Sequence, residues 1–273
     1  MIKSVLAMLA DLWRNRQLII RLSVNDFKTR YAGSIMGIFW AFVQPVITVL
    51  VYWFVFEKGL RAGAQAMGNL SVPFVLFLIS GIVPWFFFSD AWPNGTSSLI
   101  SYSYLVKKVV FKISILPIVK VMASIYVHLF FACVAIAIFW AYGFAPDLYS
   151  LQIVYYSFAA FVLALGLSYV TASIVVFFRD LSEIINILLQ ILVWVTPIMW
   201  NIETALSDGV VKTILKLNPM YYIVSGYRNA LINKKWLWET PRLTIYFWVV
   251  ALAILVLGML IFKRLKKHFA DVL

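Results

Sequence analysis

The sequence predicts an all-α integral membrane protein of one domain, residues 1–273, with six membrane-spanning helices. Hydrophobic residues make up 64% of the chain and charged residues 12%, whereas a soluble domain is about half apolar and about a quarter charged. The apolar residues gather in uncharged runs close to the roughly 20 residues that a helix needs to cross hydrocarbon. Because backbone polar groups find no water partners inside a bilayer, runs of this kind form helices.

Six uncharged runs are predicted as spans. They cover residues 35–56, 72–89, 121–142, 151–178, 184–200 and 243–262. The fourth run is long enough to tilt, whereas the fifth is barely long enough and ends at Thr196 and Pro197, which disturb its last turn. Residues 1–31 carry charges throughout, so we expect no cleavable signal peptide there.

The distribution of charge predicts the orientation of these spans. The chain has 23 Lys and Arg against 11 Asp and Glu. The cations flank the apolar runs and form no continuous basic surface of the kind that binds nucleic acid. With both termini in the cytoplasm, most of the cations lie on the inner side, as the positive-inside rule requires. The segment before the last span is an exception, because it is predicted outside and still carries several cations.

Two cytoplasmic segments are predicted. Residues 1–31 mix apolar and charged side chains, which favours helices in the headgroup layer, although a simple surface anchor would look the same. Residues 91–120 contain a predicted turn at 92–95 and a predicted helix at 102–115, which ends at Pro117. That helix is suited to docking on a soluble partner, unless its lysines only contact anionic lipid.

Residues 201–242 are predicted to lie outside. The pieces 210–217 and 220–231 are too short to cross a bilayer but too apolar for a free loop. We therefore expect short helices that dip into the outer leaflet and return, a geometry that needs packing in protein or a lined cavity. An ordinary surface loop is the alternative.

Motifs for catalysis are missing. The sequence has no G-x-x-x-x-G-K-[ST] phosphate loop, no G-x-S-x-G and no H-E-x-x-H, and its single cysteine, Cys133, excludes a cysteine-built metal site. Within a span, His128 is more simply a neutral hydrogen-bonded histidine at a helix interface than a functional group. We expect Asp90 and the charged residues within 179–183 to lie where spans leave the membrane and enter water. We expect no metal, no cofactor bound by this chain and no enzyme activity of its own.

Aromatic and amide side chains within spans one and five predict a conduit. Interfacial belts explain many of the aromatic residues, which make up 17% of the chain. The remaining set is Phe39, Trp40, Phe42, Gln44, Asn186, Gln190 and Trp194. Aromatic faces and amides without fixed charge suit sugar rings. Helix packing is the better explanation for any single aromatic, so only the whole set indicates a conduit.

Several motifs together resemble a known family. They are RNRQLI at 14–19, DFKTRYAGSIMGIFW at 26–40, Gln44-Pro45, the segment 105–117, Thr196-Pro197-Ile198 and Leu217-Asn218-Pro219. This pattern, which touches nearly the whole chain, resembles the ABC-2-type permeases that export polysaccharides. The permeases of wall teichoic acid exporters look closest, with O-antigen and capsule exporters as relatives. The stretch R-Y-x-G-S-x-[LM]-G-x-x-W is the most specific part, and Met36 stands where the family commonly has Leu.

The resemblance implies the ABC-2, or type V exporter, architecture in a bacterial plasma membrane. Two copies of the chain would work with two copies of a separate ATPase subunit, which binds ATP and Mg²⁺. The cargo would be a glycopolymer on an undecaprenyl (pyro)phosphate carrier. Spans one and five would line the conduit, and the outer re-entrant helices would cover its mouth.

Two groups of site residues follow from the resemblance. A gate helix near the lipid-phosphate entrance would contribute Arg14, Arg16, Arg21, Lys28 and Arg30, since guanidinium groups bind phosphate in a bidentate manner. A coupling helix in a groove of the ATPase would contribute Tyr102, Leu105, Lys107, Lys108, Phe111 and Lys112.

Other interpretations stay open. The cargo could be an O-antigen or a capsular polysaccharide in place of teichoic acid. The chain could instead be an ABC-2 permease for a small amphiphile or drug, although the aromatic and amide set favours a glycan. A membrane enzyme acting on a lipid-linked sugar would need an arrangement of acids that the sequence does not contain.

Overall fold

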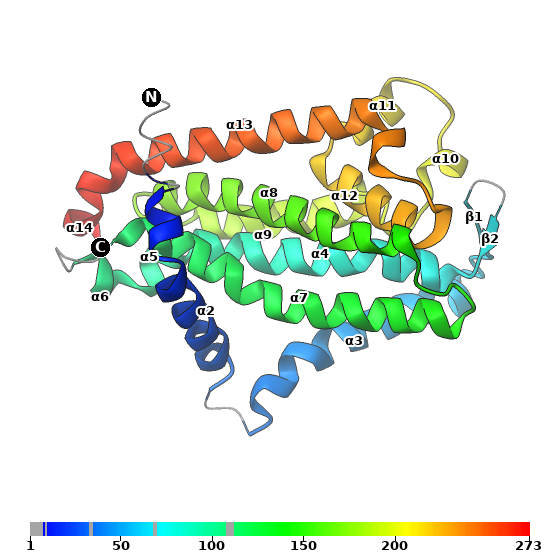
Figure 1. Ribbon diagram of the computed structural model, residues 1–273, viewed down its shortest axis with the longest axis horizontal. Helices are drawn as coiled ribbons and strands as arrows, with labels where there is room; N and C mark the ends of the chain where they lie inside the picture. The colour runs from blue at the N-terminus through cyan, green and yellow to red at the C-terminus, as the bar shows by residue number, and fades with distance from the viewer. Residues whose placement is uncertain (1–7, 9, 33–34, 68–69, 108–111) are drawn as a thin grey trace.

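Long helices that run side by side make up the computed structural model, which describes residues 8, 10–32, 35–67, 70–107 and 112–273 (Figure 1). The C-terminal helix α14, Phe269–Val272, lies at one end of the bundle, and a small β-hairpin lies at the opposite end. The hairpin pairs β1, Gln65–Met67, with β2, Leu70–Val72, and was not predicted from the sequence.

Five helical segments of the described chain are long and apolar enough to cross a membrane. They are Gly37–Gly59, Phe74–Thr96, Ile113–Ala141, Leu148–Val175 and Pro241–Val272. Their main helices are α3 (Trp40–Trp53), α4 (Phe74–Thr96), α7 (Leu116–Ala141), α8 (Gln152–Val175) and α13 (Pro241–Leu265). The predicted spans one, two, three, four and six therefore correspond to helices, with shifted ends.

The predicted fifth span is shorter than expected. The sequence indicated residues 184–200, but the helix α9 covers Leu181–Val195, or 15 residues. At 1.5 Å per residue such a helix is about 22 Å long, less than the roughly 30 Å of a hydrocarbon core. It ends where Thr196 adopts an extended conformation before Pro197, because a residue that precedes proline is disfavoured in the helical region. The boundaries predicted for this span were wrong, and five candidate spans plus one shorter apolar helix are observed.

The turn predicted at 92–95 was also wrong, because α4 continues to Thr96. Packing against α8 accounts for Gly95: a Cβ at this position would lie 2.5 Å from the Cβ of Ser168. Thr96 then bonds Thr171 of α8 at 2.6 Å between their hydroxyl oxygens. The close packing of α4 on α8 thus requires a glycine at position 95 and outweighs the turn propensity of residues 92–94.

The single helix predicted over 102–115 is not observed. The described chain has the short helices α5, Ser98–Ser101, and α6, Ser103–Val106, followed further on by a 3-10 turn at Ile113–Ile115. Lys108 and Phe111 lie outside the described residues. Pro117 stands in the first turn of α7, where its missing N–H costs no helical hydrogen bond.

The centre of the bundle is formed by α4 and α8, which pack on each other, while α7 covers α4 and α13 covers α8. Small residues bring α8 and α13 together: a Cβ on Gly258 would meet the carbonyl oxygen of Gly166 at 2.8 Å. Gly166 thus lies at a close helix contact inside one chain. Seventeen residues of α4 are buried, whereas Ala41 alone is buried on α3.

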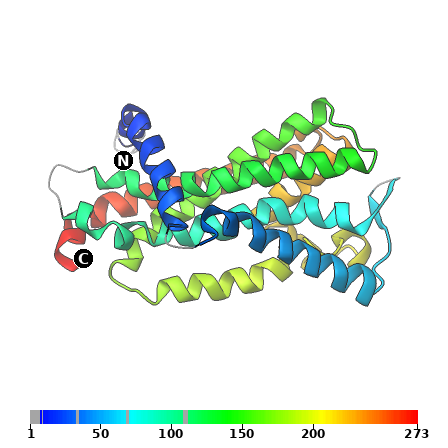
Figure 2. The same ribbon diagram turned by 90° about the horizontal axis from the view of Figure 1, so that it is seen from below.

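Helices α3 and α9 lie at the edge of the bundle (Figure 2). Their outward side chains include Ile47 and Leu50 on α3 and Ile187 and Ile191 on α9, each about half exposed. The N-terminal helix α2, Arg16–Arg30, lies across α7. These three helices are the ones that the sequence associates with a gate and a conduit.

The segment before α13 forms short helices near the hairpin. They are α10 (Ile202–Ala205), α11 (Val210–Lys216) and α12 (Pro219–Arg228), which continues as a π-helical turn at Asn229–Asn233. The prediction of helices near 210–217 and 220–231 is confirmed, with small differences at the ends. Helix α12 is buried against α4, α8 and α13.

Candidate functional site

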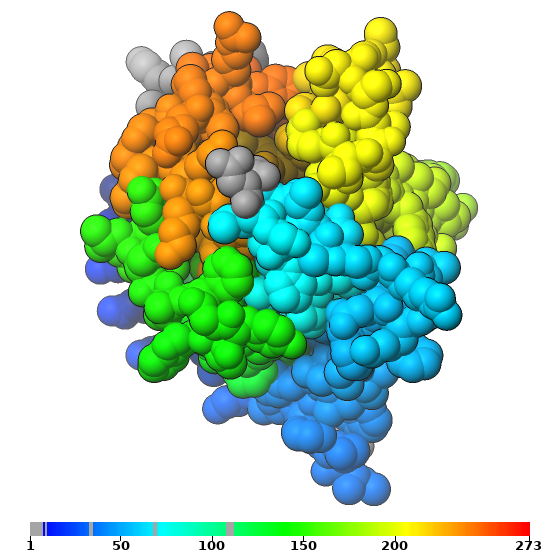
Figure 3. All heavy atoms as spheres, turned by 90° about the vertical axis from the view of Figure 1, so that its right-hand side faces the viewer, coloured from blue at the N-terminus to red at the C-terminus, as the bar shows by residue number. Residues whose placement is uncertain are grey.

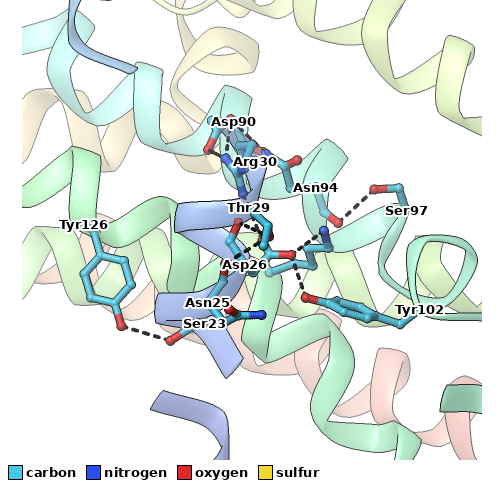
Figure 4. A network of polar contacts seen from close by, with 11 residues as sticks. Ser23, Asn25, Asp26, Thr29, Arg30, Asp90, Asn94, Ser97, Tyr102 and Tyr126 are labelled. Carbon is cyan, nitrogen blue, oxygen red and sulfur yellow. Dashed lines mark hydrogen bonds and ion pairs between the residues drawn. The ribbon is translucent and has the colours of Figure 1, made fainter. Parts of the chain in front are cut away.

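A polar network around Asp26 joins α2 to three other parts of the chain (Figure 4). Asp26 is only 4% exposed. Its Oδ1 accepts a 2.7 Å hydrogen bond from the Tyr102 hydroxyl and lies 2.6 Å from Nζ of Lys120. Arg30, one turn further along α2, lies 3.5 Å from Oδ2 of Asp26. Because a buried carboxylate is costly without its partners, this network favours one arrangement of the joined elements.

Arg30 extends the network to α4. Its Nη1 donates to both carboxylate oxygens of Asp90, at 3.2 and 3.0 Å, and Asn94 donates to the same carboxylate at 2.8 Å. Burial acts to lower the pKa of Arg30, but Asp90 and then Asp26 outweigh burial, so the pKa is raised. The guanidinium thus holds the end of α2 on α4.

Tyr102 points from the α5–α6 junction toward α2. The Lys120 ammonium lies 5.0 Å from the centroid of the Tyr102 ring, within cation–π range. Burial, followed by the hydrogen bond to Asp26, raises the pKa of Tyr102. The phenol therefore keeps its proton at neutral pH and remains a donor. A further contact, 2.9 Å between the hydroxyls of Ser23 and Tyr126, joins α2 to α7.

The predicted gate cations divide into two groups. Arg14, Arg16, Arg21 and Lys28 are exposed. Arg16 packs over the ring of Trp13 at 5.2 Å. Arg30 alone of the five turns inward, to the two carboxylates described above. The exposed four leave their charges available to an anion, whereas Arg30 has a positioning role.

The predicted coupling residues are also divided. Tyr102 faces the Asp26 network, and Leu105 packs partly against the core. Lys107 is exposed. Lys112 pairs with Asp11 at 2.8 Å in an exposed contact. The hydrogen bond from Lys112 lowers the pKa of Asp11 and outweighs the opposing effect of burial. The coupling segment is thereby fastened to the N-terminal region at two points.

The predicted conduit residues lie on two elements, the first candidate span and α9. Asn186, Gln190 and Trp194 lie four residues apart on α9, and all three are exposed. Phe39 and Trp40 are about half exposed at the start of the first span. Phe42 packs on Phe130 with ring centroids 4.4 Å apart, so helix packing explains it. The set remains a prediction.

Trp40 and Gln44 do line a pocket of about 270 Å³ between α3, α4 and α7. Asp90 and Ser124 supply polar groups to this pocket, and aromatic rings supply much of the rest of its wall. The Ser124 hydroxyl is buried and has no hydrogen-bond partner among the described residues. Amide, hydroxyl and aromatic groups therefore meet here beside the Arg30–Asp90 pair.

His128 is a hydrogen-bonded histidine at a helix interface, as predicted. Its Nε2 lies 2.9 Å from the hydroxyl of Ser157 on α8 and 3.0 Å from that of Tyr227 on α12. Ser157 and Tyr227 lie 2.7 Å apart. This triad ties α7, α8 and α12 together inside the bundle.

The described part of the chain contains no candidate metal site. No group of three His, Cys, Asp or Glu residues there could hold a metal ion. Cys133 is a free, exposed thiol.

Sequence reasoning missed Asp26 and Lys120 as site residues. Asp26 is the only acid between Asp11 and Glu57, in a stretch rich in arginine and lysine. An isolated acid among cations is a signal for an internal ion pair. Lys120 offered no comparable signal, because its partner is distant in sequence.

The described helices define a multi-pass membrane protein in which an N-terminal helix is tied to the segment between two spans. The family model of the ABC-2 type transporter matches residues 17–232, and the chain therefore belongs to the ABC-2 transporter family. The match begins within α2 and ends in the turn that follows α12.

Two bacterial relatives are similar over almost their whole length. An O-antigen export system permease protein RfbA of Klebsiella pneumoniae is 27% identical over 266 residues, which cover 94% of this chain and 95% of the relative. A protein of the same name in Myxococcus xanthus is 27% identical over 267 residues, covering 98% and 99%.

Proposed function

We propose that this chain is the membrane subunit of an ATP-driven exporter of a lipid-linked bacterial polysaccharide of the O-antigen type. Family membership makes it a transporter component, and the names of its full-length relatives support O-antigen export. The resemblance of the sequence motifs favoured teichoic acid, whereas the two relatives named above are O-antigen export permeases. The O-antigen alternative therefore becomes the main proposal, with an undecaprenyl (pyro)phosphate carrier.

The partner is a separate ATPase subunit, present in two copies and docked on residues 98–112. Within this segment the exposed Lys107 is free to meet an acidic groove. Closure of the ATPase would move the docked segment, and Tyr102 would carry the movement to α2 through Asp26. The contact between Tyr102 and Asp26 is the observation that carries this mechanism.

The conduit is assigned to the interface between two copies of the chain. Asn186, Gln190 and Trp194 form one exposed face of α9, and Trp40 and Gln44 lie near the exposed face of α3. Amides and aromatic rings on facing copies would let a glycan slide without a deep binding site. An amphiphilic drug would need no such set.

The topology proposed here has six spans and both termini in the cytoplasm. Helix α9 then crosses the membrane together with the irregular residues that follow Val195. Among these residues, the carbonyls of Pro197 and Ile198 accept hydrogen bonds from Arg228. Helices α11 and α12 become re-entrant at the outer side. In intact cells, after Cys133→Ala, a membrane-impermeant maleimide should label Ser207→Cys but not Ala270→Cys. Labelling of Ala270→Cys would contradict this topology.

Export itself is the decisive test. The chain and its ATPase subunit are produced in a strain that makes lipid-linked O-antigen but lacks its own permease. Polymer should reach the cell surface and bind an O-antigen antibody. Polymer that stays inside the cell, or export of a polyol-phosphate polymer alone, would overturn the proposal.

Docking has a separate test in the charge of the coupling segment. Lys107→Glu with Lys108→Glu should abolish co-purification of the ATPase subunit and leave the Lys112–Asp11 pair intact. Arg242→Glu is the matched control, an exposed cation at the opposite end of the bundle. Normal co-purification of the double variant would show that the ATPase docks elsewhere.

A further inference from the structure

A buried arginine lies at the end of the bundle that carries the β-hairpin. Arg228 of α12 is 6% exposed, and no ion pair joins it to a carboxylate in the part of the chain that the structure describes. Its Nη1 and Nη2 donate to the carbonyls of Pro197 and Ile198, at 2.7 and 2.8 Å. Its guanidinium carbon lies 3.7 Å from the centroid of the Phe77 ring.

These partners leave the charge of Arg228 incompletely compensated. Carbonyl dipoles and an aromatic face stabilise a guanidinium, but they supply no negative charge. In addition, Nε of Arg228 is buried and has no hydrogen-bond partner among the residues that the structure describes. A buried donor without an acceptor is costly, so this side chain favours an additional acceptor nearby.

Arg228 lines a pocket of about 310 Å³ that offers further donors. Tyr221, Ser225 and the exposed Lys235 are part of its wall, and their side chains carry hydroxyl and ammonium donors. No described residue forms an ion pair with the Lys235 ammonium, whereas the neighbouring Lys234 is paired with Asp147 at 2.6 Å. Figure 3 shows a hollow at this end, between the hairpin, the α10–α12 region and residues near 230–240.

The one acid in the wall does not oppose an anion. Glu203 lines the pocket, but its two oxygens are engaged by Lys212 at 2.7 Å and Lys216 at 2.9 Å. Lys212 also pairs with Asp208 at 2.9 Å, so the two lysines and the two acids balance, and Arg228 and Lys235 supply the positive charge of the wall. An oxyanion would therefore meet ammonium, guanidinium and hydroxyl donors here.

We propose that this pocket binds a phosphoryl oxyanion, held by Lys235 and the hydroxyls beside the buried Arg228. The chemistry is that of a phosphate monoester or of inorganic phosphate. Two sources have it, a free ion and a lipid headgroup that reaches the pocket from the membrane surface. The site requires no particular cargo and does not depend on the proposed export function.

The test uses the full chain in nanodiscs of phosphatidylcholine, with its thermal unfolding midpoint followed against inorganic phosphate at constant ionic strength. A ligand of the folded state raises this midpoint as its concentration passes Kd. Lys235→Gln should need at least about tenfold more phosphate for the same rise, because a charge-assisted hydrogen bond is lost. Lys234→Gln is the matched control and should respond as the unaltered chain does.

A second arm separates the two sources. Nanodiscs that contain phosphatidic acid should raise the midpoint of the unaltered chain and of Lys234→Gln if the ligand is a headgroup, and should then remove the response to free phosphate. If only free phosphate acts, the ligand is an ion. Either result supports the site, provided that Lys235→Gln is impaired. No response in either arm, or equal responses from all three chains, would overturn it.

Discussion

The hydroxyl of Tyr102 donates a 2.7 Å hydrogen bond to Oδ1 of Asp26, a residue 76 positions earlier in the chain. Tyr102 belongs to the segment that the sequence associates with ATPase docking, and Asp26 belongs to the helix that it associates with the gate. One contact thus connects the two regions to which the proposed mechanism assigns a joint movement. Lys120 and Arg30 make the acceptor an ion-paired carboxylate.

Asp26→Asn should destabilise the chain by about 3–5 kcal/mol, because Lys120 and Arg30 lose a buried counterion. Both cations are poorly exposed, at 14% and 20% of their side chains. Thermal unfolding in detergent measures the change. Asp11→Asn is the control: its pair with Lys112 is exposed, so its loss should cost less than about 1 kcal/mol. Equal effects of the two variants would contradict a central position for Asp26.

Tyr102→Phe removes one hydrogen bond and leaves every charge in place. A hydrogen bond to a charged group contributes about 1.5–3 kcal/mol, so the loss of stability should be smaller than for Asp26→Asn. Under the proposed mechanism, the ATPase partner should still dock, but transport per ATP hydrolysed should fall. Reconstituted vesicles measure both quantities. Tyr104→Phe, at an exposed tyrosine two residues away, should change neither.

Much of the fold could be predicted because hydropathy reports directly on burial in lipid. The runs around α7, α8 and α13 give helices at the expected places. The disturbance at Thr196 and Pro197 was predicted, but the path of the chain after α9 was not, since the distant Arg228 holds the carbonyls of Pro197 and Ile198. Likewise, the sequence around Gly95 predicts a turn, and only the packing of Gly95 against α8 explains why the helix continues there.

The candidate site was less predictable than the fold. The family resemblance indicated a gate helix in this region, but it does not reveal that Arg30 turns inward while Arg21 stays exposed. Contacts such as Tyr102 with Asp26 join positions far apart in the chain and depend on the tertiary arrangement. Asn186 and Gln190 form one face of α9, as their spacing indicates, but the conduit role proposed for them requires a second copy.

Glu203 predicts a pH dependence at the hairpin end of the bundle. The hydrogen bond from Lys212 is the main reason that its pKa lies below the ordinary 4.5, against the opposing effect of burial. An acid with a lowered pKa contributes stability that is fully present above pH 4.5 and is lost as the pH falls through the lower, folded value. The unfolding midpoint of the unaltered chain should therefore exceed that of Glu203→Gln at pH 7. The gap should close on acidification below pH 4.5, and a gap that does not change with pH would contradict this origin.

Gly95→Ala should destabilise the junction of α4 and α8 by about 1–3 kcal/mol, as overpacking of a close helix contact does. The added Cβ would lie 2.1 Å from Oγ and 2.5 Å from Cβ of Ser168, so one of the two helices must shift. Ser168→Gly removes both of these atoms and should restore much of the lost stability in the double variant. Gly63→Ala, where no atom lies within 4 Å of the new Cβ, is the control for the loss of glycine itself. Unfolding midpoints of the unaltered chain, the two single variants and the double variant measure the coupling between positions 95 and 168. Additive effects of Gly95→Ala and Ser168→Gly would show that the two residues are not in tight contact.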